Sequence, residues 1–162
     1  MNKPYTVGIA DMKICRAPGV LITYALGSCV GICIYDPVLR LAGLIHIMLP
    51  NMYKNQHDSN ILKFADTGIP EIIRKMEAFG ASRSRLVAKI AGGAKMFEVA
   101  GGNSSLNNIG ARNVESVRMV LRKERIPILK EDVGSNYART LSFDASTGDA
   151  IVKSFGKGEI KL

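Results

Sequence analysis

Residues 23–50, TYALGSCVGICIYDPVLRLAGLIHIMLP, decide the fold that we predict for this chain. Two apolar runs rich in β-forming residues, Cys29 to Tyr35 and Leu41 to Leu49, lie within it, and Pro50 ends the second run. Asp36-Pro37 between them is typical of a turn, because proline presets φ and the aspartate side chain can bind the backbone beyond it. Two apolar runs around a short turn predict a β-hairpin.

The register of this hairpin decides which side chains meet. A four-residue loop over residues 36–39 places Tyr35 opposite Arg40 and, farther along, Cys29 opposite His46. Directly opposed residues share one face, with Cβ atoms about 5 Å apart. The pattern therefore predicts an imidazole within reach of a thiol proton. A slip of one residue would put the two side chains on opposite faces.

Cys29 and His46 are thus a candidate nucleophile and a candidate base. A thiol becomes a good nucleophile when it loses its proton, and we expect a neighbouring histidine to lower its pKa. The Thr23 hydroxyl could accept from the other imidazole N–H, and the turn at Gly27 and Ser28 could leave backbone N–H groups free for a developing oxyanion. The structural alternative is that the cysteine and histidine are packed core residues and that the threonine is only a good strand former.

These residues resemble the CheD family, the chemoreceptor glutamine deamidases of bacterial chemotaxis. The resemblance covers most of the chain in four ordered blocks, which are the hairpin with Thr23 before it, residues 89–97 (KIAGGAKMF), residues 108–114 (NIGARNV) and residues 131–134 (EDVG). It implies a catalytic triad of Cys29, His46 and Thr23, and a β-sandwich core.

The resemblance also implies the reaction and its partners. The protein would be a cysteine-dependent protein-glutamine glutaminase that converts selected glutamines of methyl-accepting chemotaxis receptors to glutamate through a glutamyl thioester. A secondary receptor methylesterase activity and a CheC-type phosphatase partner would accompany it, and no cofactor is expected. Residues 51–60 and Ser135 depart from the family pattern, so substrate and partner choice are expected to depend on them.

Composition limits the other possibilities. With 162 residues, 47% of them hydrophobic, the chain is long enough for one domain over residues 1–162 with a sizeable core. No apolar run reaches the length of a membrane span, the N-terminus lacks a signal-peptide pattern, and three cysteines are an odd number for a disulfide framework. A cytoplasmic protein without membrane insertion is therefore expected.

The net charge of +8 is compatible with nucleic acid, an anionic membrane surface or an acidic protein partner. The chain has no tryptophan, only 6% aromatic residues and no recognisable nucleic-acid-binding motif, which argues against nucleic acid. A zinc site is also disfavoured, because His46 and His57 are the only histidines, and Cys33 is interpreted as a packing residue. The remaining alternative to an enzyme is a non-catalytic binding module for a chemotaxis phosphatase or receptor.

The remaining secondary structure is predicted from periodicity and turn residues. One helix is expected from near Ile61 to Gly80, with a kink or break near Gly68 caused by Pro70, and a second from about Ile109 to Arg125. Further strands are expected over residues 5–14, 19–26, 86–91, 128–133, 138–144 and 149–155, with a loosely held tail at 156–162. The pattern predicts a single α+β domain with mainly antiparallel, β-sandwich-like sheets and about two covering helices.

Overall fold

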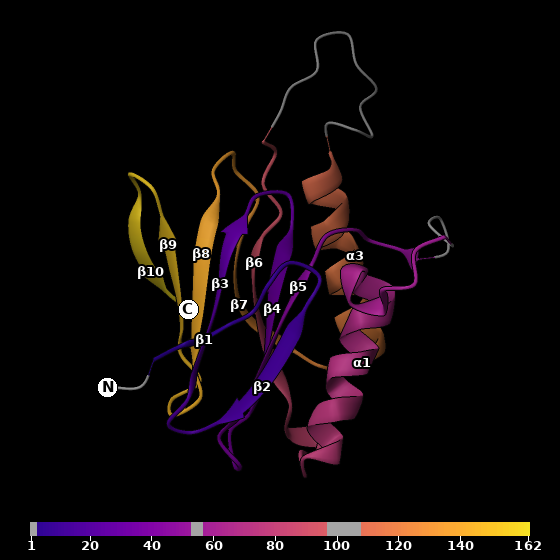
Figure 1. Cartoon of the computed structure of the whole chain (residues 1–162), viewed down its shortest axis with the longest axis vertical. Helices are drawn as coiled ribbons and strands as arrows, with labels where there is room; N and C mark the ends of the chain where they lie inside the picture. Colours follow the sequence, from indigo (N-terminus) through magenta and orange to yellow (C-terminus); the bar gives the residue numbers. More distant parts are fainter. Residues whose placement is uncertain (1–2, 53–56, 97–107) are drawn as a thin grey trace, which may run out of the picture.

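The computed structural model describes residues 3–52, 57–96 and 108–162. These residues form three layers, in which two five-stranded sheets pack face to face and two α-helices cover the outer face of one of them (Figure 1). The predicted α+β architecture, with β-sandwich-like sheets and two covering helices, is confirmed.

The sheets differ in strand order. In spatial order, the first sheet contains β1 (Tyr5–Thr6), β3 (Val20–Leu26), β8 (Arg139–Asp144), β9 (Ala150–Ser154) and β10 (Gly158–Lys161). The second contains β2 (Met12–Arg16), β5 (Leu41–Ile47), β4 (Val30–Asp36), β6 (Val87–Gly92) and β7 (Ile128–Val133). The helices are α1 (Ala65–Ala78) and α3 (Ile109–Lys123). The pairs β1–β3 and β6–β7 are parallel, and the other neighbours are antiparallel.

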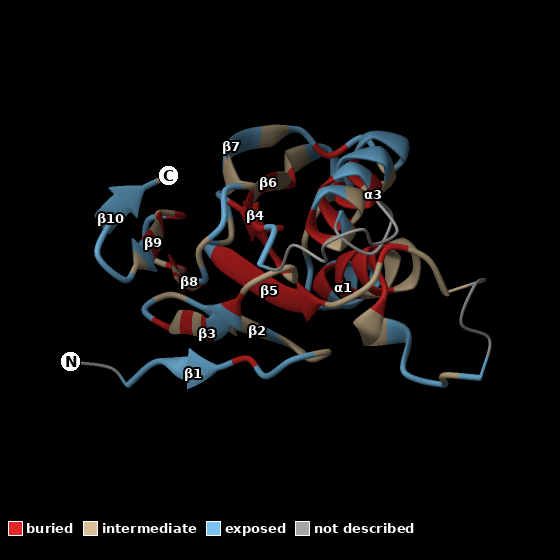
Figure 2. Cartoon of the chain, turned by 90° about the horizontal axis from the view of Figure 1, so that it is seen from above, coloured by how far each residue is buried: buried red, intermediate tan, exposed pale blue. Residues whose placement is uncertain are grey.

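Strands β4 and β5 are buried on both faces, which explains their almost continuous apolar sequences (Figure 2). Ile32 and Ile45 belong to the cluster shared with the helices. Cys33 and Leu44 belong to the cluster between the two sheets. The central hairpin therefore holds the three layers together by burying apolar surface on both sides.

The hairpin register differs from the predicted one by two residues. Asp36 pairs with Leu41 as the last pair of the ladder, so the four-residue loop covers residues 37–40 instead of 36–39, and His46 lies opposite Gly31. The Asp36 side chain accepts hydrogen bonds from two backbone N–H groups of this loop, at 3.0 and 3.2 Å. The predicted pairing of Cys29 with His46 is wrong. A shift of two keeps the same face, however, and makes the two residues diagonal neighbours in the strand register.

Helix α1 begins later than predicted and contains Pro70. Asn60 caps a short 3₁₀ turn over residues 61–63 by accepting from the Leu62 N–H at 3.0 Å, and the α-helix starts at Ala65. Of the predicted kink or break near Gly68, the break is wrong, because α1 is continuous across Pro70. A Cβ atom at Gly68 would lie 2.7 Å from Ile45, so this glycine permits close packing of the helix on β5.

Two terminal segments also differ from the predictions. Residues 5–14 form two strands in different sheets rather than one, because the chain turns at Gly8–Asp11, where Ala10 has a φ of 57°. Residues 158–161 are not a loose tail but strand β10, which pairs with β9. The strands β1 and β2 pair with β3 and β5, which lie farther along the chain, whereas β10 forms a local hairpin with β9.

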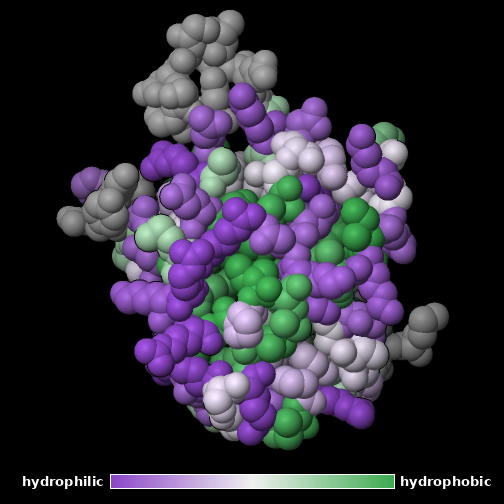
Figure 3. Space-filling view, turned by 180° about the vertical axis from the view of Figure 1, so that it is seen from behind, coloured by the Kyte–Doolittle hydropathy of each residue, from purple (hydrophilic) through white to green (hydrophobic). Residues whose placement is uncertain are grey.

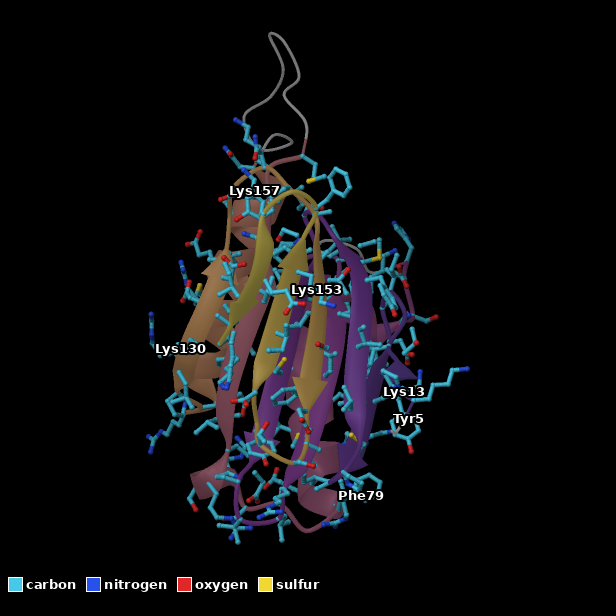
Figure 4. All side chains as sticks on the ribbon, turned by 90° about the vertical axis from the view of Figure 1, so that its left-hand side faces the viewer. Tyr5, Lys13, Phe79, Lys130, Lys153 and Lys157 are labelled. Atoms are coloured by element: carbon cyan, nitrogen blue, oxygen red, sulfur yellow. The ribbon has the colours of Figure 1, made fainter. Side chains whose placement is uncertain are left out.

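The surface is mixed in character. Figure 4 shows Lys153 and Lys157 on the β9–β10 side of the first sheet, and Lys13, from β2 of the second sheet, extending outward at the right of the view. Figure 3, which shows the molecule from behind the view of Figure 1, shows apolar residues gathered in the middle of that face, with polar residues around them. A cavity of about 250 Å³ lies between the sheets and is lined by residues that include Cys33, Leu129 and Phe143. No helix in the described part of the chain is long and apolar enough to cross a membrane.

Candidate active site

Thr23 and His46 are in direct contact within the sandwich. The Thr23 hydroxyl lies 2.7 Å from Nδ1 of His46 and 2.8 Å from the carbonyl oxygen of Val7, and both side chains are fully buried. A hydroxyl has one proton, and the Val7 carbonyl can only accept it. Thr23 therefore accepts from Nδ1–H, and the second ring nitrogen, Nε2, carries the lone pair.

The environment of His46 keeps its ring neutral. Burial lowers the pKa of His46 to about 4, because the charged imidazolium is poorly solvated there. Nε2 is buried and has no hydrogen-bond partner among the described residues. A neutral imidazole with a fixed tautomer and an unused Nε2 lone pair is suited to accept a proton from a nearby acid.

Cys29 lies in the turn between β3 and β4, two residues before Gly31, the partner of His46. Its side chain is half-buried and packs against the inter-sheet cluster. Burial raises the pKa of its thiol, and its own backbone N–H opposes this only in part. The expectation that the histidine lowers this pKa is therefore wrong for the structure as it stands, because a neutral ring offers no charge to offset desolvation. No hydrogen bond joins Cys29 to His46 within the described residues.

The turn that carries Cys29 is fixed through its carbonyl groups. The carbonyl oxygens of Gly27 and Cys29 accept from the N–H groups of Ala94 and Gly93, both at 2.8 Å, and the Ser28 carbonyl accepts from Asn113 at 2.9 Å. The Gly27 N–H donates to Ala25 at 3.0 Å and is already engaged. In the described part of the chain, the N–H groups of Ser28 and Cys29 donate to no backbone carbonyl. Of the two residues predicted to leave their N–H groups free, Gly27 therefore has its N–H engaged, and Ser28 has no backbone acceptor among the described residues.

Two glycines provide the space that this arrangement needs. A Cβ atom at Gly31 would lie 2.7 Å from Leu141 and 3.2 Å from Leu26, so only glycine fits opposite His46 without displacing the inter-sheet core. Gly92 has a φ of 117°, and a Cβ atom there would lie 2.3 Å from the Cys29 carbonyl oxygen. The backbone of Gly92, at the end of β6, therefore packs directly against the backbone of Cys29, with no room for a side chain between them.

Known protein families and individual proteins include clear relatives of this chain. A family profile described as CheD chemotactic sensory transduction matches residues 48–154. The chain belongs to the CheD family. A CheD protein from Lachnoclostridium phytofermentans is 47% identical over 162 residues, which is the full length of both chains. One from Syntrophomonas wolfei is 52% identical over 159 residues, 98% of each chain, and one from Caldanaerobacter subterraneus is 50% identical over 157 residues, 97% of this chain and 96% of its own. Each of the three is named "Probable chemoreceptor glutamine deamidase CheD".

The structure brings some of the predicted residues together and adds others. Thr23 and His46 form a hydrogen bond, and Cys29 lies at the same end of β4, whereas Cys33 is fully buried and His57 is exposed. Among the residues described, no group of three or more His, Cys, Asp or Glu side chains is arranged to hold a metal ion.

Sequence reasoning missed two residues of this CheD site, Val7 and Asn113. Val7 acts through its backbone carbonyl, which no side-chain pattern reveals. Asn113 did leave a signal, because it is a polar residue next to Val114 and one helical turn before Val117, on the buried face of α3. A buried asparagine normally has a hydrogen-bonding role.

Proposed function

We propose that this CheD protein hydrolyses the side-chain amide of selected glutamines in the cytoplasmic helices of methyl-accepting chemotaxis receptors. The observation that carries the proposal is the Thr23–His46 hydrogen bond, which leaves Nε2 of His46 as a buried base with no hydrogen-bond partner in the part of the chain that the structure describes. The names of its full-length relatives support the substrate class. The protein would act in the cytoplasm.

The first half of the reaction forms a thioester. Nε2 of His46 takes the proton of the Cys29 thiol as the sulfur attacks the amide carbon of the glutamine. The backbone N–H of Cys29, with that of Ser28, donates to the oxyanion that develops. Collapse of this intermediate breaks the carbon–nitrogen bond, and the proton on Nε2 passes to the departing nitrogen, which leaves as ammonia.

The second half releases glutamate. Nε2 takes a proton from a water molecule as its oxygen attacks the thioester carbon, and the carbon–sulfur bond then breaks as the proton returns to the thiolate. Thr23 accepts from Nδ1–H throughout, so that it holds the orientation of the ring and, whenever the ring is neutral, its tautomer, in the manner of the third member of a hydrolase triad. The same thioester could form from a glutamyl methyl ester with loss of methanol, which would give a secondary methylesterase activity.

The raised pKa of Cys29 has a consequence for the order of events. The resting site holds a thiol and a neutral imidazole rather than a thiolate–imidazolium pair, because both pKa shifts favour the uncharged forms. Proton transfer would therefore accompany attack on bound substrate. A resting thiol would also limit side reactions with small electrophiles.

The test is incubation of the protein with a receptor cytoplasmic fragment, followed by peptide mass spectrometry for replacement of a glutamine amide by a carboxyl group. Cys29→Ala is expected to abolish the conversion. Cys33→Ala is the matched control, because Cys33 lies on the same strand face but is fully buried in the inter-sheet core. If Cys29→Ala still converts the receptor at the wild-type rate, the assigned nucleophile is wrong. If the wild-type protein only binds the receptor, the protein is a non-catalytic binding module.

A further inference from the structure

Asn113 is a fully buried polar side chain on α3, outside the proposed triad. Its Nδ2 donates to the carbonyl oxygens of Ser28 and Met48, both at 2.9 Å. Its Oδ1 is buried and has no hydrogen-bond partner among the described residues. An apolar residue would avoid the cost of that unpaired acceptor, but it would leave two carbonyl groups without their donor.

The two carbonyl groups flank the two proposed catalytic residues. Ser28 directly precedes Cys29, and Met48 follows His46 by two residues. The two N–H bonds of an amide lie in one plane at a fixed angle, so both acceptors must stay at a fixed separation. One side chain from the helix layer thus connects the turn that carries the thiol to the end of the strand that carries the imidazole.

The contact with Ser28 also sets a direction. The peptide unit between Ser28 and Cys29 is planar and trans, so its C=O and N–H point in opposite directions. Holding the Ser28 carbonyl toward α3 therefore aims the Cys29 N–H away from α3. The bonds from Ala94 to Gly27 and from Gly93 to Cys29 fix the neighbouring peptide units from β6 and the residues that follow it.

We propose that Asn113 is a positioning residue, which orients the Ser28–Cys29 peptide so that its N–H can stabilise the oxyanion and which fixes this turn relative to the His46 strand. The inference rests on the proposed function, because it assigns the role of that N–H in the same reaction. Asn113 touches no reacting atom and acts only through the backbone that it holds.

The test compares Asn113→Leu with Ser116→Ala. Leucine keeps a branched side chain of similar size and has no donor. Ser116 is the matched control, because it lies on the same helix, is buried, and donates to the Pro50 carbonyl at 3.0 Å without reaching the cysteine turn. We expect kcat for receptor deamidation to fall at least about tenfold in Asn113→Leu with little change in KM, since loss of one oxyanion donor costs about 10²–10³ in rate. Ser116→Ala should stay near the wild-type kcat.

Two further readouts separate positioning from simple loss of structure. Alkylation of Cys29 by iodoacetamide needs no oxyanion donor, so its rate should stay within about twofold of wild type in Asn113→Leu while kcat falls. The amide NMR resonances of Ser28 and Cys29 should shift in this variant and not in Ser116→Ala. If Asn113→Leu does not fold, Asn113→Ser, which keeps one donor, should show the same changes to a smaller degree.

The outcomes distinguish the two proposals. If Cys29→Ala is inactive but Asn113→Leu, or Asn113→Ser in its place, keeps the wild-type kcat and amide resonances, the positioning role is overturned and the proposed function stands. If the wild-type protein does not deamidate the receptor, the proposed function fails. The amide resonances alone then decide whether Asn113 sets the orientation of the turn.

Discussion

The hydroxyl of Thr23 accepts a hydrogen bond from Nδ1–H of His46 and donates one to the carbonyl oxygen of Val7. This pair of hydrogen bonds fixes the tautomer of the ring, because neither proton can move without leaving a buried group unpaired. The lone pair therefore lies on Nε2 because the fold places the Thr23 hydroxyl next to Nδ1, and no charged group is needed for this.

Thr23→Val tests this relationship most directly, since valine has the same shape and lacks the hydroxyl. Loss of an orienting buried hydrogen bond of about 1–3 kcal/mol corresponds to roughly a 5- to 150-fold loss of deamidation rate. Nitrogen NMR of the imidazole should show a mixture of tautomers in place of one. Thr140→Val, on the neighbouring strand β8, is the control and should change neither quantity. A single unchanged tautomer in Thr23→Val would contradict the assignment.

The buried neutral histidine predicts a loss of stability in acid. The folded pKa of about 4 lies below the ordinary histidine value of 6.5, so between these values the unfolded chain binds a proton that the folded protein excludes. Stability therefore falls as the pH decreases from about 6.5 toward 4, by at most about 3 kcal/mol from this group. Urea denaturation at several pH values should show a shallower pH dependence for His46→Gln than for the wild type.

His57→Gln is the control for that measurement, because the chain has two histidines and His57 is exposed. Its pH dependence should match that of the wild type. Equal slopes for His46→Gln and the wild type would show that the ring is not held neutral. The same pKa predicts that the deamidation rate stays constant from pH 7 to about pH 5 while the protein is folded, since the base keeps its lone pair.

Gly92→Ala should damage both the fold and the site. A Cβ atom at this position would lie 2.3 Å from the Cys29 carbonyl oxygen, and its φ of 117° is a conformation that alanine rarely adopts. Gly156→Ala is the control, because Gly156 also has a positive φ, 74°, but has nothing within 4 Å of its added Cβ. We expect Gly92→Ala to lose at least about 2 kcal/mol more unfolding free energy than Gly156→Ala. Similar losses in urea denaturation would mean that the close approach of β6 to the turn is not needed.

A competition experiment tests the CheC-type partner. A receptor helix must reach Cys29 to react, and we expect a CheC-type phosphatase to cover the same face of the molecule. Saturating partner should then slow receptor deamidation and raise the apparent KM while leaving kcat unchanged. A receptor conversion rate that is independent of partner concentration would exclude a shared face, although it would allow binding elsewhere.

The local parts of this structure could be predicted from the sequence. The central hairpin, α3 and the strand over residues 128–133 follow from apolar periodicity and turn residues, and their bounds agree within two residues at each end. The predicted hairpin register differs from the observed one by two residues, because Asp36 both forms the last pair of the ladder and caps the loop that follows. A pattern of apolar residues cannot separate these two roles.

The long-range parts could not be predicted in the same way. The parallel pairing of β6 with β7 and the splitting of residues 5–14 between two sheets depend on contacts between distant segments. The raised pKa of Cys29 also depends on burial that the sequence does not reveal. The same is true of Asn113, because its role becomes visible only when Ser28 and Met48 lie beside it.

Strand β3, which carries Thr23, belongs to one sheet, whereas His46 and the strand that follows Cys29 belong to the other. The proposed reaction therefore requires the two halves of the sandwich to keep one alignment, since sliding one across the other by a fraction of a bond length would lengthen the hydrogen bond that orients the base. The deamidation rate therefore depends on the relative position of the two sheets. A protein that binds to both sheets and shifts one relative to the other would lower the deamidation rate without contacting the Cys29 thiol and without unfolding the domain.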